Sequence, residues 1–358
     1  MKLSIIIVNY NVTRLLRNCL NSIQQYISNL DYEVIVMDNL SPDDSWKVLI
    51  DEFSNVKFIE NTSNEGFAKA NNKAAKLATG EYILLLNPDT EFEGNMMKEI
   101  LDFADAQSNF GCLGVRLHDL EGRFLLESKR SVPDVFNSFE KLFTPFSLKN
   151  KSKKGYYRND IAENDIAEVD AITGAFMLMK KNLYLEIEGL DEAYFMYGED
   201  IDISYSAELA GYTNYYKGDI TVLHYKGEST KRDKKYFKIF FEAMMIFLAK
   251  YYKDNWLNYQ VLRTGIAVKY CVEMIKFNLS NQSNQQKVEV NKNELNWINQ
   301  LSELKNQQNQ NIVLDTERFS YQEILSIISQ YNSSNTSFYI HPKNKNYVIG
   351  DDKKVIRI

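Results

Sequence analysis

Acidic and amide side chains follow several apolar stretches of the chain, at the point where each stretch ends. Carboxylate oxygens are the ligands that hard divalent cations prefer, and amide groups form hydrogen bonds with hydroxyl and phosphate oxygens. Because loops are polar in any protein, one such cluster carries little weight. Four clusters together favour a ligand site; they are Asn9-Tyr10-Asn11, Asp38-Asn39, Asn61 to Gly66 and Asn87-Pro88-Asp89.

A second acidic group follows an aromatic run further along the chain. Glu199, Asp200 and Asp202 come directly after Tyr194–Tyr197. Carboxylates that crowd together beside apolar rings hold their protons more tightly, which suits a general base. The alternative is a solvated helix start, since the helix dipole stabilises acids at an N-terminus. The preceding aromatic run favours the base.

Strand and helix patterns alternate through the segment that carries the four polar clusters. Helical spacing of apolar residues separates the predicted strands, with Thr13 and Ser41 as N-caps of the first two helices. Such an order predicts a parallel sheet with helices on both faces, whose ligands bind at the carboxyl ends of the strands. The predicted strands are Lys2–Val8, Tyr32–Met37, Val56–Ile59 and Tyr82–Leu86.

Composition narrows the class of protein. The chain has 358 residues, 44% of them hydrophobic, which is enough for a catalytic domain with an appendage. A net charge of -6 disfavours a nucleic-acid partner and fits a small anionic ligand held through a metal. Its three cysteines form no CxxC pair, and no segment reaches the roughly 18 apolar residues of a membrane span. These features predict a cytoplasmic protein.

Several short motifs occur in a recognisable order between Met1 and Ser229. They are Ile5–Asn11, Val36–Asn39, Asn64–Ala68 with Ala70–Asn72, Gly80–Thr90, Gly174-Ala175, Gly189–Glu192 and Phe195–Asp202. In this respect the chain resembles the inverting family-2 glycosyltransferases, especially the rhamnosyltransferase-like members. The resemblance implies the GT-A nucleotide-sugar-binding fold, a Rossmann-like, mostly parallel α/β sheet. It also implies transfer of a sugar from a nucleoside-diphosphate donor to an acceptor.

The resemblance gives roles to residues of the polar clusters. Asp89 would hold Mn2+ or Mg2+ against the donor diphosphate, with Glu91 as a helper, and Asn87 replaces the first acid of the family's Asp-x-Asp motif. His224 would be a second metal or diphosphate contact. A turn or cap at Asn87–Asp89 and a structural strand-end His224 are the alternatives that need no metal. The expected donor-binding residues are Asn9, Asn11, Asp38, Asn64, Lys69, Asn72, Asn87 and Asp89.

On the acceptor side, the resemblance makes Asp200 the base that removes the acceptor proton, beside Glu199. Gly174, Ala175 and Asp202 are expected to line the acceptor side of the site. One departure is Ser206, where relatives carry an arginine, so Lys226 or Arg232 would have to replace that cation.

The sequence divides into a catalytic domain at 1–230, an aromatic-rich helical segment at 231–279, an Asn/Gln-rich linker with partial helix at 280–310, and a small α/β tail at 311–358. Lysines among the aromatics fit a peripheral contact with the inner face of the plasma membrane, where a lipid-linked acceptor would lie. Packing on the catalytic domain or a homodimer interface are the alternatives.

The predicted function is transfer of a sugar from a dTDP- or UDP-sugar, dTDP-rhamnose among them, to a cell-surface polysaccharide or lipid-linked glycan. Two alternatives are weighed. A nucleotide-sugar-binding scaffold that has lost catalysis is supported by Asn87 and Ser206, but Asp89 and Asp200 are retained. A sugar nucleotidyltransferase would need a glycine- and arginine-rich loop after the first strand, and residues 9–13 contain no glycine.

Overall fold

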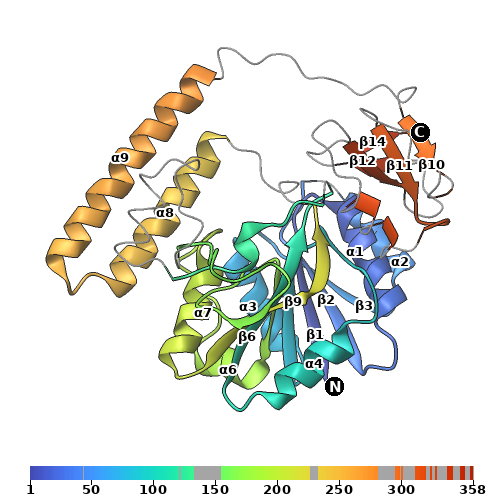
Figure 1. The fold of residues 1–358 in the computed structure, drawn as a ribbon, viewed down its shortest axis with the longest axis horizontal. Helices are drawn as coiled ribbons and strands as arrows, with labels where there is room; N and C mark the ends of the chain where they lie inside the picture. The colour runs from blue at the N-terminus through green and yellow to red at the C-terminus, as the bar shows by residue number, and fades with distance from the viewer. Residues whose placement is uncertain are drawn as a thin grey trace.

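The computed structural model describes most of residues 1–230 and parts of the C-terminal region. The described residues are 1–42, 44–120, 122–132, 155–225, 233–280, 295–298, 300, 311–319, 323–324, 327–328, 337–341, 347–350 and 355–357. Figure 1 shows a large central sheet wrapped by helices, with a long helical hairpin on one side and a small second sheet on the other.

One half of the central sheet is parallel, as the sequence predicts. Its strands are β1 (Leu3–Asn9), β2 (Tyr32–Asp38), β3 (Val56–Glu60) and β4 (Tyr82–Leu86), in the spatial order β3-β2-β1-β4. The β1–β2 register places Asn9 opposite Asp38. The ends of these strands therefore bring the predicted polar clusters to one rim of the sheet.

The other half of the sheet is mixed. β8 (Phe176–Lys180) pairs antiparallel with β4 and with β6 (Phe110–His118), and β6 pairs parallel with β9 (Thr213–His224). The short strands β5 (Thr90–Phe92) and β7 (Ile166–Glu168) pair antiparallel with β9. In the β5–β9 register Thr90 lies opposite His224, so the residues after β4 meet the end of β9.

Alternate residues of β1 enter two separate hydrophobic cores, which confirms that helices cover both faces. Ile5 and Ile7 pack with α1 (Thr13–Tyr26), α2 (Val48–Glu52) and α4 (Met97–Ala106). Ile6 and Val8 pack on the opposite face, under α3 (Phe67–Leu77), α6 (Lys181–Glu186) and α7 (Glu199–Leu209). Side chains alternate across a strand, so a strand covered on both faces is apolar throughout.

Two predicted helix starts are wrong, and the reason bears on the site. Thr13 is the first residue of α1 and caps nothing; its hydroxyl contacts Ser45 Oγ at 2.7 Å. The second helical segment begins at Ser45 with η1 (Ser45–Lys47), not after Ser41. Ser41 instead uses its hydroxyl to hold Asp38.

The helical segment is a hairpin of α8 (Lys234–Tyr251) and α9 (Trp256–Ser280). The side chain of Asp233 caps α8 by accepting a hydrogen bond from the Tyr236 N–H at 2.8 Å. α8 packs against α7 through the Ala243–Phe247 stretch and against α9 through Phe241 and Leu248. No helix in the described parts of the chain is long and apolar enough to cross a membrane.

The C-terminal tail forms a second sheet in the order β10-β11-β12-β13-β14. Its strands are Leu295–Ile298, Asn311–Asp315, Ser337–His341, Tyr347–Gly350 and Val355–Arg357. Within 280–310, where the sequence predicts a partial helix, Leu295–Ile298 form a strand, because pairing with β11 buries Ile298; residues 281–294 and 301–310 lie outside the described residues. The sheet's apolar residues share a core cluster with Val12, Leu223 and Tyr225 of the catalytic region.

Candidate functional site

A cavity of about 810 Å³ lies between the rim of the central sheet, the start of α7 and the helical hairpin. Ten residues that the sequence analysis named line this cavity. They are Asn11, Asn39, Asn64, Asn87, Asp89, Gly174, Ala175, Glu199, Asp200 and His224. Its volume is in the range of sites that bind small molecules the size of a nucleotide sugar.

Asp89 and His224 face each other in this cavity. The Nε2 atom of His224 lies 3.4 Å from the Asp89 carboxylate, and both residues are largely buried. Pairing of β5 with β9 fixes this arrangement, and the backbone N–H of Tyr225 also donates to the Asp89 carbonyl at 2.9 Å. The sheet register, rather than a flexible loop, therefore sets the distance between carboxylate and imidazole.

This pair offers one carboxylate oxygen and one imidazole nitrogen, and both bind divalent metal ions in proteins. At 3.4 Å the two atoms are close enough for one ion to contact both. Within the described residues no group of three or more His, Cys, Asp and Glu side chains is placed to hold a metal. The donor set fits an ion whose remaining ligands come from a substrate or water.

Asp38 is held by a small polar network at the end of β2. It is 1% exposed and accepts hydrogen bonds from Asn9 Nδ2 and Ser41 Oγ, each at 2.6 Å, and from the Ser41 N–H at 2.8 Å. Ser41 Oγ in turn accepts from the Asn11 N–H at 2.9 Å. Asn11, with φ of 58°, lines the cavity, whereas Asn9 and Asp38 lie behind its wall.

Asn39 organises the loop that follows β3, and it was not among the predicted site residues. Its Nδ2 donates to Asn64 Oδ1 at 2.9 Å, and its Oδ1 accepts from Asn61 and from the Glu65 N–H. Both Asn39 and Asn64 line the cavity. The Asp38-Asn39 pair was visible in the sequence, but only the structure separates a buried anchor from a residue that faces the cavity.

Asp200 stands at the start of α7 on the opposite wall. Its Oδ2 accepts hydrogen bonds from Arg130 Nη2 at 2.7 Å and from the Gly174 N–H at 3.1 Å. The Arg130 side chain is 9% exposed and that of Asp200 15%, so the ion pair is shielded from water. A Cβ at position 174 would make ordinary van der Waals contact with the Asp200 side chain at 3.4 Å, so the space there also admits alanine.

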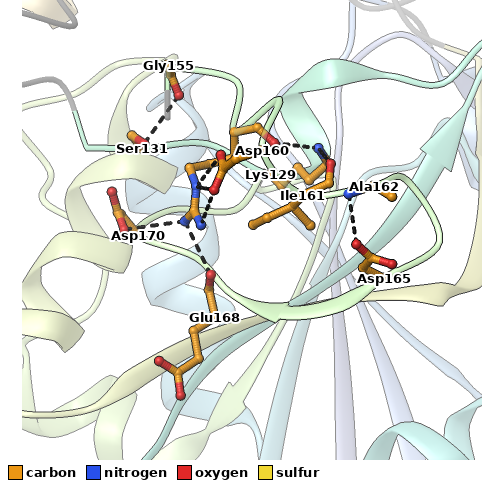
Figure 2. Close-up of polar contacts among 10 residues, drawn as sticks. Lys129, Ser131, Gly155, Asp160, Ile161, Ala162, Asp165, Glu168 and Asp170 are labelled. Atoms are coloured by element: carbon orange, nitrogen blue, oxygen red, sulfur yellow. Dashed lines mark hydrogen bonds and ion pairs between the residues drawn. The ribbon is translucent and has the colours of Figure 1, made fainter. Parts of the chain in front are cut away.

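Arg130 is the main residue that the sequence did not reveal. It reaches Asp200 because a bridge pairs its backbone with Ala171, and its neighbours are fastened on both sides. Lys129 donates to the carbonyls of Arg158 and Ile161, and Ser131 bonds Gly155 (Figure 2). In the sequence, Arg130 is marked only by the preceding Lys129, and this pair does not indicate that Arg130 contacts Asp200.

Glu199 lies beside Asp200 and is 6% exposed. Its Oε2 atom is buried without a hydrogen-bond partner among the described residues. Burial, followed by the charge of Asp200, raises the pKa of Glu199 to about 8, while Arg130 acts in the opposite direction. Burial therefore favours the neutral, protonated form of the Glu199 carboxyl.

Asp202 points away from the cavity and is paired behind it. Lys250 of α8 donates to Asp202 at 2.8 Å and to Asp191 at the same distance. Burial is the main cause that raises the pKa of Asp202. Ser206 stands where relatives carry an arginine, and its Oγ contacts Tyr251 Oη at 3.2 Å. Lys250 thus supplies a cation near this position; Lys226 and Arg232 lie outside the described residues.

Besides Asn9, Asp38 and Asp202, three further predicted residues do not line the cavity. Lys69 is exposed on α3. Asn72 is buried, where its side chain bonds the backbone of Leu190 and accepts from Tyr184 Oη at 2.5 Å. Glu91 is 1% exposed and bonds Asn18 and Tyr225 inside the protein. Asn72 and Glu91 therefore hold the framework of the site together.

Comparison with known proteins gives a family and a fold. Residues 4–183 match the model of glycosyl transferase family 2. N-acetylglucosaminyl-diphospho-decaprenol L-rhamnosyltransferase of Mycobacterium tuberculosis is 26% identical over 62% of this chain and 76% of its own length. Rhamnosyltransferase WbbL of Escherichia coli is 28% identical over 57% of this chain and 78% of its own length.

A solved structure supports the fold. The crystal structure of GalNAc-T7 with UDP, GalNAc and Mn2+ superposes with a TM-score of 0.51 at 16% sequence identity. The superposition covers 78% of this chain and 58% of that one. It confirms the GT-A fold expected from the motifs.

Proposed function

Because the chain belongs to glycosyl transferase family 2, we propose that it transfers a sugar from a nucleoside-diphosphate sugar, with inversion, to a hydroxyl of a glycan or lipid-linked acceptor. One observation carries this proposal: the Asp89–His224 pair and the Asp200 carboxylate face the same cavity. Two relatives are named as rhamnosyltransferases, so dTDP-rhamnose is the first donor to test among dTDP- and UDP-sugars.

On the donor side, Asp89 and His224 would hold Mn2+ or Mg2+ against the diphosphate. When bound, the ion offsets the negative charge that the nucleoside diphosphate develops as it leaves. Asn11 and Asn64 line the cavity with amide groups and would bind the nucleoside and sugar hydroxyls, while Asn39 uses its amide to hold the loop that carries Asn64. Asp38 holds the loop that carries Asn11 through Ser41.

On the acceptor side, Asp200 would accept the proton of the attacking hydroxyl. Its ion pair with Arg130 fixes its direction, and the Gly174 N–H holds the same oxygen, Oδ2. Inversion requires the base and the leaving diphosphate on opposite sides of the anomeric carbon. Asp200 and Asp89 line the same cavity from α7 and from the loop before β5, which supports that placement.

We also propose that the α8–α9 hairpin contacts the inner face of the plasma membrane, where a lipid-linked acceptor would lie. Between 234 and 280 it has eight basic and three acidic residues, on a chain of net charge -6. Apolar side chains such as Trp256 and Leu257 are exposed on α9. Both features favour an anionic bilayer surface. Vesicle flotation tests this; a homodimer that forms without vesicles would contradict it.

Calorimetry with UDP, dTDP and GDP, each with and without Mn2+, tests the donor site. We expect one nucleotide to bind with metal, and Asp89→Ala to weaken that binding by at least about tenfold through loss of the metal. Asp219→Ala, which removes an exposed carboxylate outside the cavity, is the control. If no nucleotide binds at millimolar concentration, the transferase proposal fails and a non-catalytic role replaces it.

A further inference from the structure

The cavity continues beyond the carboxylates, along one face of α8. The residues of α8 that line it recur every three or four positions, as on a single helical face: Lys235, Tyr236, Ile239, Phe240, Ala243, Met244, Phe247 and Leu248. Leu262 and Ile266 of α9 line the same space. α8 and α9 therefore form an arm of the cavity that begins beside Asp200 and Tyr197.

The arm changes in character along α8. At the start of α8 its walls are aromatic, with Phe195, Tyr197, Tyr236 and Phe240 in contact with one another or with the cavity. Further along α8, where Ala243 and Phe247 also pack against α7, the lining side chains other than Tyr252 carry no oxygen or nitrogen; with Ile239 they are Ala243, Met244, Phe247, Leu248, Leu262 and Ile266. A sugar hydroxyl placed among these apolar side chains, away from the Tyr252 hydroxyl, would leave water without gaining a hydrogen bond, at a cost of about 1–3 kcal/mol.

From this change we infer that the arm binds the apolar chain of a lipid-linked acceptor, an isoprenoid or alkyl chain joined to the glycan through phosphate. The inference rests on the proposed function, since it places the glycan end of the same acceptor at Asp200. The sugar hydroxyls lie at the carboxylate end, where Glu199 and Asp200 are, and the chain lies between α8 and α9.

The mouth of the arm has a cation for the linking phosphate. Lys235 lines the cavity, and its ammonium lies 6.0 Å from the centre of the Phe195 ring. Asp233 is also in the wall, but its carboxylate caps α8 through the Tyr236 N–H. α9 has exposed apolar side chains, and the hairpin has a net positive charge. Both features suit contact with a membrane surface, where a lipid-linked acceptor resides.

Two isoprenoid diphosphates with the same headgroup test the inference. Farnesyl diphosphate has three isoprene units and dimethylallyl diphosphate one. Binding to the full chain is measured by calorimetry below the concentration at which micelles form. Saturating nucleoside diphosphate and Mn2+ keep the probe's diphosphate out of the donor site. We expect the longer chain to bind at least about a hundredfold more tightly, because each buried methylene adds affinity.

Three variants locate the chain. Leu262→Asn makes the arm polar and should reduce the affinity for farnesyl diphosphate by at least about tenfold, whereas Leu257→Asn makes the same change at an exposed position of α9 and should not. Met244→Trp fills the arm without adding charge and should reduce only the binding of the longer chain. Thermal unfolding and nucleotide binding report whether each variant is folded.

Equal affinity for the two chain lengths, or equal effects of Leu262→Asn and Leu257→Asn, would overturn the inference while nucleotide binding persists. If no nucleotide binds, the proposed function fails instead. The chain-length comparison is then repeated without nucleotide, so the two failures remain distinct.

Discussion

Two acidic centres face one cavity, and their charges are balanced in different ways. At the sheet rim, Asp89 is paired with the imidazole of His224, whose own charge depends on its protonation. At the start of α7, Asp200 is paired with a guanidinium, and Asp202 behind it with an ammonium. The centre at α7 carries permanent cations of its own, whereas the centre at the rim suits a metal ion.

The two centres also differ in how they are held. Adjacent strands fix Asp89 and His224 through a continuous backbone ladder. Asp200 depends on side chains from Arg130 and, further back, Lys250, which come from segments far away in the sequence. A single substitution at α7 should therefore change the rate of transfer without changing the fold. A substitution in the paired strands at the rim should affect both.

The largest expected effect is at Asp200 itself. Asp200→Asn keeps the hydrogen bonds to the backbone but removes the base, so the rate of transfer should fall about 10²–10⁴-fold. Metal-dependent nucleotide binding should stay within about twofold of the wild type, since that belongs to the other centre. A parallel loss of nucleotide binding would show that the two centres are not independent.

Arg130→Met should come next. Without the guanidinium the Asp200 carboxylate loses the partner that fixes its direction, so the rate of transfer should fall by about tenfold or more while metal-dependent nucleotide binding is kept. Arg130→Lys should restore part of the rate. Arg158→Met is a matched control, because Arg158 is equally buried but pairs with Asp160 and Asp170; it should lower stability and leave the rate of transfer by the folded protein unchanged.

Glu199→Gln should change how stability depends on pH. With its pKa raised to about 8, Glu199 keeps its proton in the folded protein, whereas the unfolded chain releases it from about pH 4.5. Its contribution to stability is therefore complete below pH 4.5 and is lost as pH rises towards 8. Relative to the wild type, the variant should gain about 3–4 kcal/mol between pH 5 and pH 8 in denaturant titrations.

The neighbouring charges set the conditions for that titration. Asp200 and Asp202 raise the pKa of Glu199 and Arg130 lowers it, so Glu199→Gln is best compared with the wild type in otherwise unchanged protein. A stability difference that stays constant with pH would contradict a buried, protonated Glu199.

The smallest effect is expected behind the site. Lys250→Met leaves the buried carboxylate of Asp202 without its ammonium partner, which should reduce the free energy of unfolding by about 1–2 kcal/mol. The estimate is kept low because the Lys250 side chain is 36% exposed. Lys253→Met, at an exposed position just after α8, should change stability by less than about 0.5 kcal/mol.

The sequence predicted which residues lie at the rim of the sheet, because each part of the rim is a short local pattern. Apolar strands followed by Asn11, Asp38 or Asp89 place those residues at a sheet edge by topology alone. The pattern could not predict whether each side chain turns into the protein or faces the cavity. Asp38 and Asn72 turn inward to hold loops, whereas Asn39 faces the cavity, and only packing decides between these outcomes.

The acceptor side was predictable only in part. Glu199 and Asp200 belong to a local motif, but Arg130 reaches Asp200 across seventy positions of sequence through a single antiparallel bridge. Lys250 comes from a helix whose charged residues look like those of any exposed surface. Long-range ion pairs leave no periodic signal, so they appear only once the chain is folded.

The C-terminal sheet sets a boundary for anyone who wishes to shorten or recombine this chain. Its apolar residues share a cluster with Val12, which also lines the cavity, and with Leu223 and Tyr225 on either side of His224. Trimming the chain after α9 would expose the apolar residues of that cluster, including Leu223 and Tyr225 beside His224. For truncation, domain exchange or fusion, the tail is therefore best kept with residues 1–225.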